Sequence, residues 1–277
     1  MAKALAGLLL GAAGLAACLP PQDTPEPAAE EHETRPDIAP GDLVLLPCSA
    51  GTDRPCAVLI AGGKRLMFGA PAGAGQQADE ADLADLEALF LFSVHPEDIA
   101  GVDEVRNRGW RAGRLDPLPL TGPVGTGVLV QGLNMAYEQP DAISFVEDGA
   151  PAGGFVAALL SHANDITEET LVYDSGDVKV RAAPGRNTWL SYRVGYRDLD
   201  ETWHEIVMTP CGAETAVGDG EYEVEAANRL SVGCPVPQPV EEAASDAGET
   251  EVTEAETAGP DYAWPLEAPV FAEKTER

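Results

Sequence analysis

Short apolar runs recur through the first third of the chain, at a length typical of β-strands. Two of them flank Gly62-Gly63, and paired glycines at this place favour a tight hairpin turn. The run over residues 88–92 is apolar throughout, which predicts a strand buried on both faces. The strands expected in this part of the chain span residues 42–46, 57–61, 65–68 and 88–92.

Helical spacing follows the polar loop over residues 93–98. Ile99, Val102 and Val105 recur three residues apart and predict a helix with one apolar side. The acidic residues at the end of the loop suit the start of this helix, because carboxylates interact favourably with the helix dipole there. Two further helices are expected over residues 81–86 and 128–137.

The second half of the core is expected to consist mostly of strands. Several neighbouring runs can pair as meanders, which favours a mixed sheet with helices on its outer faces over alternating β-α-β units. The predicted fold class is therefore α/β. The expected strands span residues 141–146, 155–160, 170–173, 178–183, 189–196 and 205–208.

The N-terminus has the pattern of a bacterial export signal. Lys3 precedes an unbroken run of apolar and small residues over positions 4–17, and Leu15-Ala16-Ala17-Cys18 ends the run with a lipobox. The run is shorter than the roughly 20 apolar residues that a membrane span needs. We therefore predict that residues 1–17 are removed and that Cys18 carries a lipid, such as palmitate, that holds the protein at the bilayer. A simple secretory signal is the alternative.

The segment after the cysteine predicts where the protein is held. Leu19, rather than aspartate, follows Cys18. By resemblance to a bacterial sorting rule, this indicates the outer membrane rather than the inner one, with the protein facing the periplasm. Residues 18–40 are rich in proline, glutamate and alanine, and we expect them to form a disordered tether.

Charge and composition divide the rest of the chain. The formal net charge is −30, and the core over residues 40–234 alone holds 30 acidic and 13 basic residues. This acidity argues against a nucleic-acid partner, because binding to phosphates rests largely on cationic side chains. The predicted parts are a signal peptide at 1–17, a tether at 18–40, one domain at 41–234 and a disordered acidic tail at 235–277.

The acidic tail contains an apolar island with Tyr262, Trp264 and Phe271. Such an island can dock back on an exposed sheet edge, or it can bind a protein partner as a short extended segment. An unstructured tail is the third alternative. The sequence leaves the three open.

Five cysteines are present, and Cys18 is assigned to the lipid. The other four are an even number in a compartment that permits disulfides. Of the three possible connectivities, the pairs with the shortest loops are Cys48 with Cys56 and Cys211 with Cys234. Some of the four could instead remain free thiols.

Five segments occur in the order and spacing of a known family. Val44-Leu45-Leu46 resembles the family's first strand, and Leu59 to Phe68 its opening hairpin. Leu89 to Val105 resembles its metal-motif strand, loop and helix. Leu118 to Thr126 resembles its "PLPVYGPPGT" segment, and Ser191 to Val194 its "GYR(I/V)" strand. The chain thus resembles the metallo-β-lactamase-fold hydrolases, in their ribonuclease Z and arylsulfatase-like branch. The resemblance implies an αββα sandwich of mixed sheets, truncated in its C-terminal half.

The resemblance also implies where metal ligands would lie. The family's histidine-rich ligands hold two metal ions, usually zinc, which activate a water for hydrolysis. In this chain only one of the implied positions keeps a histidine. The family motif H-x-H-x-D-H falls on Ser93, His95, Glu97 and Asp98, the next histidine falls on Ser175, and the bridging aspartate falls on Cys211.

These departures predict a domain without a resident cofactor that acts as a non-catalytic binding or scaffold module. The alternative is a hydrolase of phosphodiesters or sulfate esters that holds zinc or another divalent metal with His95, Glu97 and Asp98. A third reading gives the function to the acidic flanks, as spacers or recruiters. His162 and His204 lie in no recognised nucleophile motif, so we expect them to be hydrogen-bonded or surface histidines.

Overall fold

A computed structural model describes residues 36–185, 188–211, 213, 218, 222–234 and 260–273. From Asp37 onward they belong to one compact unit. The predicted signal peptide, Cys18 and most of the predicted tether lie outside the described residues.

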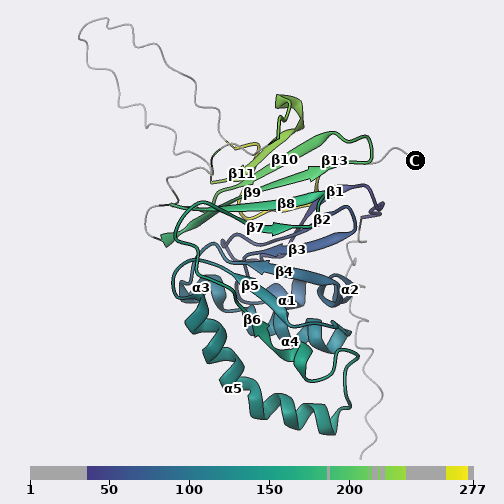
Figure 1. Ribbon diagram of the computed structural model, residues 1–277, viewed down its shortest axis with the longest axis vertical. Helices are drawn as coiled ribbons and strands as arrows, with labels where there is room; N and C mark the ends of the chain where they lie inside the picture. Colours follow the sequence, from purple (N-terminus) through teal and green to yellow (C-terminus); the bar gives the residue numbers. More distant parts are fainter. Residues whose placement is uncertain are drawn as a thin grey trace, which may run out of the picture. The chain divides into compact units, whose positions relative to one another are not determined.

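The strands form two sheets that face each other (Figure 1). The first sheet has the order β13-β1-β2-β3-β4-β5-β6, and the second has the order β12-β11-β10-β9-β8-β7. Both sheets mix parallel and antiparallel pairs. The strands of the first sheet are β1 (Leu43–Pro47), β2 (Ala57–Ala61), β3 (Lys64–Phe68), β4 (Leu86–Phe90), β5 (Leu118–Thr121), β6 (Leu160–Ser161) and β13 (Val270–Glu273). Those of the second are β7 (Thr170–Asp174), β8 (Val178–Pro184), β9 (Leu190–Arg197), β10 (Trp203–Met208), β11 (Arg229–Gly233) and β12 (Tyr262–Ala263).

An aromatic cluster fills the space between the sheets. The ring centroids of Phe68 and Phe90, on the first sheet, lie 4.9 Å apart, and Tyr192 of the second sheet meets both rings. The Tyr192 hydroxyl donates a 2.6 Å hydrogen bond to the carbonyl of Leu91, so this buried polar group is satisfied. Alternate residues of the facing strands supply the rest of this core, which explains the period-two patterning of β8.

Helices cover the other face of the first sheet (Figure 1). A second apolar layer lies between the helices and the sheet, with Val105 and Val130 on the helices and Val58 and Met67 on the strands. The predicted class, α/β with two mixed sheets and outer helices, is confirmed. Within the described residues the helices lie on one sheet only, so three of the four layers of the implied sandwich are present. The helices are α1 (Ala74–Gln77), α2 (Glu80–Ala84), α3 (Pro96–Ile99), α4 (Val102–Ala112) and α5 (Thr126–Glu147), with short 3-10 turns η1 (Val156–Ala158) and η3 (Ala226–Asn228).

Most predicted strands lie within two residues of the observed ones, but the strand predicted over residues 141–146 is wrong. Helix α5 continues through Pro140, and these residues form its last turns. Proline usually ends a helix. Here the buried Asp141 pairs with Arg106 of α4, at 2.7 and 3.1 Å, and this pair holds the end of α5 against the helical layer. The strand predicted over 155–160 is also wrong: half of it forms η1, and only its last residue belongs to β6.

The apolar island of the acidic tail docks back on the domain, as one of the three alternatives had it. β13 pairs antiparallel with β1, and β12 pairs parallel with β11, so the segment joins an edge of each sheet. Trp264 is buried, and its indole donates to the carbonyl of Thr209 at 3.1 Å. The predicted disordered tail over 235–277 is corrected for residues 260–273, because their apolar side chains complete the core between the sheets.

Both predicted disulfides are confirmed. Cys48 is bonded to Cys56, and Cys211 is bonded to Cys234. The first bond is fully buried, beside the turn that connects β1 to β2. The second joins the segment after β10 to the end of β11.

Candidate functional site at the metal-motif loop

The loop after β4 holds the four residues of the implied metal motif. Ser93 and Asp98 are both buried, at 1% and 5% exposure. The Ser93 hydroxyl donates to one carboxylate oxygen of Asp98 and accepts a 3.0 Å hydrogen bond from the backbone N–H of His95. These bonds close the loop on itself, so Ser93 and Asp98 support each other at the start of α3.

A guanidinium, which the sequence analysis missed, approaches the two carboxylates of this loop. Arg54 lies 3.5 Å from one oxygen of Asp98 and 3.8 Å from one oxygen of Glu97. Asp98 is buried, whereas Glu97 is largely exposed. The positive charge therefore sits beside the buried carboxylate of Asp98, which stands where the implied motif has its last histidine, and it offsets the cost of burying that charge.

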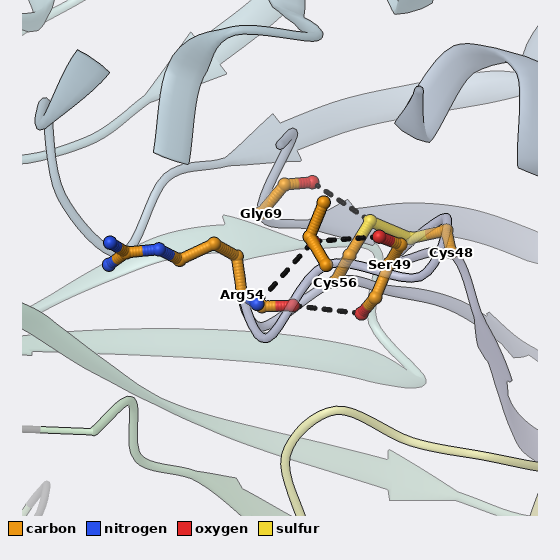
Figure 2. The surroundings of a disulfide bond; sticks show 6 residues. Cys48, Ser49, Arg54, Cys56 and Gly69 are labelled. Atoms are coloured by element: carbon orange, nitrogen blue, oxygen red, sulfur yellow. Dashed lines mark hydrogen bonds between the residues drawn. A yellow bond between two sulfur atoms is a disulfide. The ribbon is translucent and has the colours of Figure 1, made fainter. Parts of the chain in front are cut away.

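Local bonds in the loop between the first two cysteines place Arg54 there (Figure 2). The Cys48–Cys56 disulfide closes a loop with a sequence separation of eight. Within it, the Ser49 hydroxyl donates to the carbonyl of Arg54 at 2.8 Å, and the Thr52 hydroxyl donates to the carbonyl of Ser49 at 2.7 Å. The backbone of Arg54 is thus fixed, and its side chain extends away from the disulfide in Figure 2.

The other positions of the implied ligand set have local roles. The ring of His95 packs against that of Trp189, with centroids 5.5 Å apart. The Ser175 hydroxyl bonds both the N–H and the carbonyl of Val178, in the turn between β7 and β8. Cys211 is bonded to Cys234, so it offers no thiolate. The structure therefore places Arg54 beside Glu97 and Asp98 and bonds Ser93 to Asp98. Ser175 and Cys211 have other roles.

The residues present do not fit the pair of metal ions that the fold family implies. A neutral hydroxyl at Ser93 and a disulfide sulfur at Cys211 are poor zinc ligands, and one imidazole remains. Arg54 offers only donors and would repel a cation next to Asp98. The described part of the chain contains no group of three or more His, Cys, Asp and Glu side chains that could hold a metal.

His162 helps to hold an aspartate at the start of α5. Its Nε2 lies 2.8 Å from an oxygen of Asp165, and its Nδ1 lies 2.9 Å from the carbonyl of Leu120. Asp165 accepts the backbone N–H groups of Gly125 and Gly127 at 2.9 and 3.0 Å. Burial raises the pKa of Asp165, but these two backbone bonds and the bond to His162 outweigh it and hold the pKa below its ordinary value.

His204 belongs to a similar pair on the second sheet. It is buried at the start of β10, and its Nε2 lies 2.9 Å from an oxygen of Asp198. Burial raises the pKa of Asp198, but the bonds from His204, Thr202 and Asp200 lower it by more. The prediction that His162 and His204 are hydrogen-bonded histidines is consistent with both arrangements.

Two features near the site had weak signals in the sequence. Asp165 caps α5 from a distant loop, so the usual cap position just before a helix gives no hint of it. Arg54 lies inside the loop closed by Cys48 and Cys56, and the predicted disulfide was the only sequence feature that pointed to this loop. A pocket of about 540 Å³ opens beside Asp165. Its lining consists of Thr121, Ala163, Asn164, Asp165, Ile166, Thr167, Glu168, Thr170, Leu171 and Val172.

Known proteins resemble this chain in structure but not in sequence. No protein-family model matches the chain, and no curated protein matches it. Several solved structures do match the chain in fold. The short form of human tRNase Z is 17% identical, with a TM-score of 0.42, over 69% of this chain and 76% of that one. The metallo-β-lactamase fold protein YhfI from Bacillus subtilis is 13% identical, with a TM-score of 0.42, over 61% of this chain and 62% of that one.

A diphosphatase of the PhnP family is 15% identical, with a TM-score of 0.40, over 61% of this chain and 64% of that one. The chain thus spans less than two thirds of the length of the Bacillus protein and of the diphosphatase. The likeness concerns the fold alone. Proteins of the predicted family, including one of its ribonuclease Z branch, are among the structures that resemble this chain.

Proposed function

We propose that this chain is an exported lipoprotein, anchored through Cys18 and facing the periplasm, whose metallo-β-lactamase-like domain is a non-catalytic binding or scaffold module. The observation that carries the second half of the proposal is the ion pair of Arg54 with Asp98. Its guanidinium lies 3.5 Å from the buried carboxylate and partly offsets its charge, so this carboxylate does not need a metal ion as its counter-charge.

Hydrolysis in this fold family depends on metal-bound water, and the residues here use the ligand positions differently. Ser93 closes the loop onto Asp98, and Cys211 fastens β11 through its disulfide. Each position has become part of the folded framework. The domain keeps the shape of a hydrolase without the means to activate a water molecule.

The pocket beside Asp165 supports a binding role. Its ten lining residues include the carboxylates of Asp165 and Glu168 and no lysine or arginine. An acidic concave surface favours a neutral or cationic ligand over a phosphate or sulfate ester. Anionic esters are the substrates of the alternative reading, so the charge of this pocket counts against it.

The anchor rests on the lipobox at Leu15-Ala16-Ala17-Cys18. Among the described residues, no helix is both long and apolar enough to cross a bilayer. A protein partner at the tail is a separate proposal. Of its three aromatic residues, Trp264 is buried and Phe271 lies in β13, which leaves Tyr262, 40% exposed, as the side chain that could meet such a partner.

Metal analysis combined with assays of activity tests the domain's role. We expect the purified protein to contain no stoichiometric zinc or manganese and to turn over neither a phosphodiester nor an aryl sulfate. Arg54→Ala is the informative variant, because it leaves the Asp98 carboxylate without its cation and should gain affinity for a divalent metal. Stoichiometric metal in the wild type, with turnover that His95→Ala abolishes, would establish the hydrolase instead.

Labelling of cells with a palmitate analogue tests the anchor. We expect label in the wild type and none in Cys18→Ala. Leu19→Asp is the matched variant for sorting: it should keep the label and move the protein from the outer-membrane to the inner-membrane fraction. Equal labelling of wild type and Cys18→Ala would refute the lipoprotein.

A further inference from the structure

Helix α5 has two faces of different character. Its inner face makes specific contacts: Asn134 bonds the backbone of Leu160 at 2.9 Å, Tyr137 donates to Asp103 at 2.6 Å, and Asp141 pairs with Arg106. The outer face carries exposed apolar residues. Of the ten large apolar side chains that are exposed in the described residues, four lie on this helix: Val128, Met135, Ile143 and Val146, at 75%, 77%, 49% and 80% exposure.

Six of the exposed residues of α5 follow the spacing of a helix-pairing seam. Starting at Val128, they recur after four and three residues in alternation, which keeps them on one side of the helix. None of them is charged. A Cβ added to Gly132 would meet nothing within 4 Å, so the seam is open at its small residue. The seam consists of Val128, Gly132, Met135, Gln139, Ala142 and Val146, all exposed.

The seam can pack against the same seam of a second, antiparallel copy of α5. If a second copy of α5 lies antiparallel, with the two-fold axis at position 137, Val128 of one copy faces Val146 of the other. Gly132 then faces Ala142, and Met135 faces Gln139. Every contact is therefore matched in size: small residues meet at two points, where the backbones can approach, and longer side chains meet elsewhere.

We propose that this seam is a dimer interface, in which α5 packs antiparallel against α5 of a second copy of the same chain. A bilayer would need neither the four-three spacing nor the matched small residues. The stretch from Leu115 to Asp177 also contains no lysine or arginine, which anionic lipid would require. The proposal does not depend on lipidation or on the absence of catalysis.

Length and charge set the strength of the dimer. The helix has 22 residues and is about 33 Å long, so one helix pair buries less than a standard interface. Glu138 lies next to the proposed axis, where the carboxylates of the two copies approach each other. Their repulsion weakens the pair, and salt screens it. We therefore expect a dissociation constant in the micromolar range that falls as salt is added.

Cysteine cross-linking tests the register. The mature chain carrying Cys18→Ala has its other cysteines in disulfides. Gly132→Cys protein mixed with Ala142→Cys protein should form a cross-linked dimer under mild oxidation. Each variant alone should not, because identical positions lie about 15 Å apart in the antiparallel register. Cross-links in the single variants would indicate parallel helices and overturn the proposal.

Sedimentation velocity tests the association itself. Met135→Asp should weaken the dimer more than tenfold, whereas Leu199→Asp, which changes a side chain 82% exposed near β10, should leave it unchanged. Glu138→Gln should strengthen it severalfold. A wild type that stays monomeric up to millimolar concentration would overturn the proposal. Monomers that bind phosphatidylcholine vesicles through Met135 would also overturn it and identify a lipid surface instead.

Discussion

The two sheets are stabilised in different ways, and the strands of each sheet therefore have a different sequence pattern. The first sheet is buried on both faces: every residue of β2 is inaccessible, and helices cover its outer side. The outer face of the second sheet carries charged residues, among them Arg193 and Glu205, which form a buried ion pair. Strands of the first sheet therefore occur as apolar runs, and those of the second as alternating patterns.

The charges are also distributed differently. In the helical layer of the first sheet, one buried pair, Arg106 with Asp141, joins α4 to α5. On the second sheet, Glu205 contacts both Arg193 and Arg229, so removal of one arginine leaves it a partner. We expect the helical layer to be the more sensitive of the two to a single substitution.

Asp141→Ala has the largest expected effect. It leaves the guanidinium of Arg106, which is fully buried, without its carboxylate, and such a loss costs about 3–5 kcal/mol of unfolding free energy. Denaturant titration would measure it. Asp148→Ala, at the exposed pair with Arg111, is the control and should cost less than about 1 kcal/mol. Equal losses for the two variants would mean that the buried pair contributes no more than the exposed pair, and that the helical layer does not depend on it.

Trp264→Ala tests how the two sheets are joined. The side chain packs against Phe92 of the aromatic core, 5.7 Å between centroids, and bonds Thr209, so its removal should cost about 3 kcal/mol. Limited proteolysis should then cut the tail at lower protease concentration. Tyr262→Ala, two residues earlier and 40% exposed, is the matched control. An unchanged unfolding midpoint for Trp264→Ala would mean that the tail contributes nothing to the core.

Asp165→Asn tests how much the aspartate of the His162–Asp165 pair contributes to stability at different pH values. The pKa of Asp165 is lowered from 3.8 in the fold, so its charge stabilises the protein above about pH 4 and that stability is lost as the pH falls through the folded pKa. The variant should be less stable than wild type by roughly 0.3–1 kcal/mol at pH 7, because a neutral amide loses the attraction between the carboxylate and the start of the helix. The difference should shrink as the pH falls below about 4. A difference that stays constant with pH would exclude the carboxylate's charge as its cause.

Asp198→Asn should follow the same pH dependence with a smaller effect. The pKa of Asp198 is also lowered, but its bonds hold a turn between β9 and β10 rather than the start of a 22-residue helix. Thermal unfolding at pH 7 and pH 3 would compare the two variants directly. A larger loss for Asp198→Asn would place the more important pair on the second sheet.

The sequence predicted the site's composition better than its arrangement. The histidine at position 95, the two carboxylates that follow it and the two favoured disulfide pairs could be predicted, because they follow from a local motif and short loops. Arg54 could not, because its contact with Asp98 joins residues 44 positions apart, and nothing in its own neighbourhood indicates the partner. The same reason explains the wrong strand over 141–146, where a distant arginine holds the helix past Pro140.

The sequence by itself indicated most strands of both sheets and the favoured pairing of the four core cysteines, and through the resemblance it indicated that only one implied ligand position keeps a histidine. Each depends on residue type and on spacing over a few positions. Only the tertiary structure decided that Arg54 meets the remaining carboxylate, that Trp264 returns the tail to both sheets, and that the apolar side of α5 faces outward. These features depend on which distant segments pack together, and local sequence patterns do not indicate such long-range contacts.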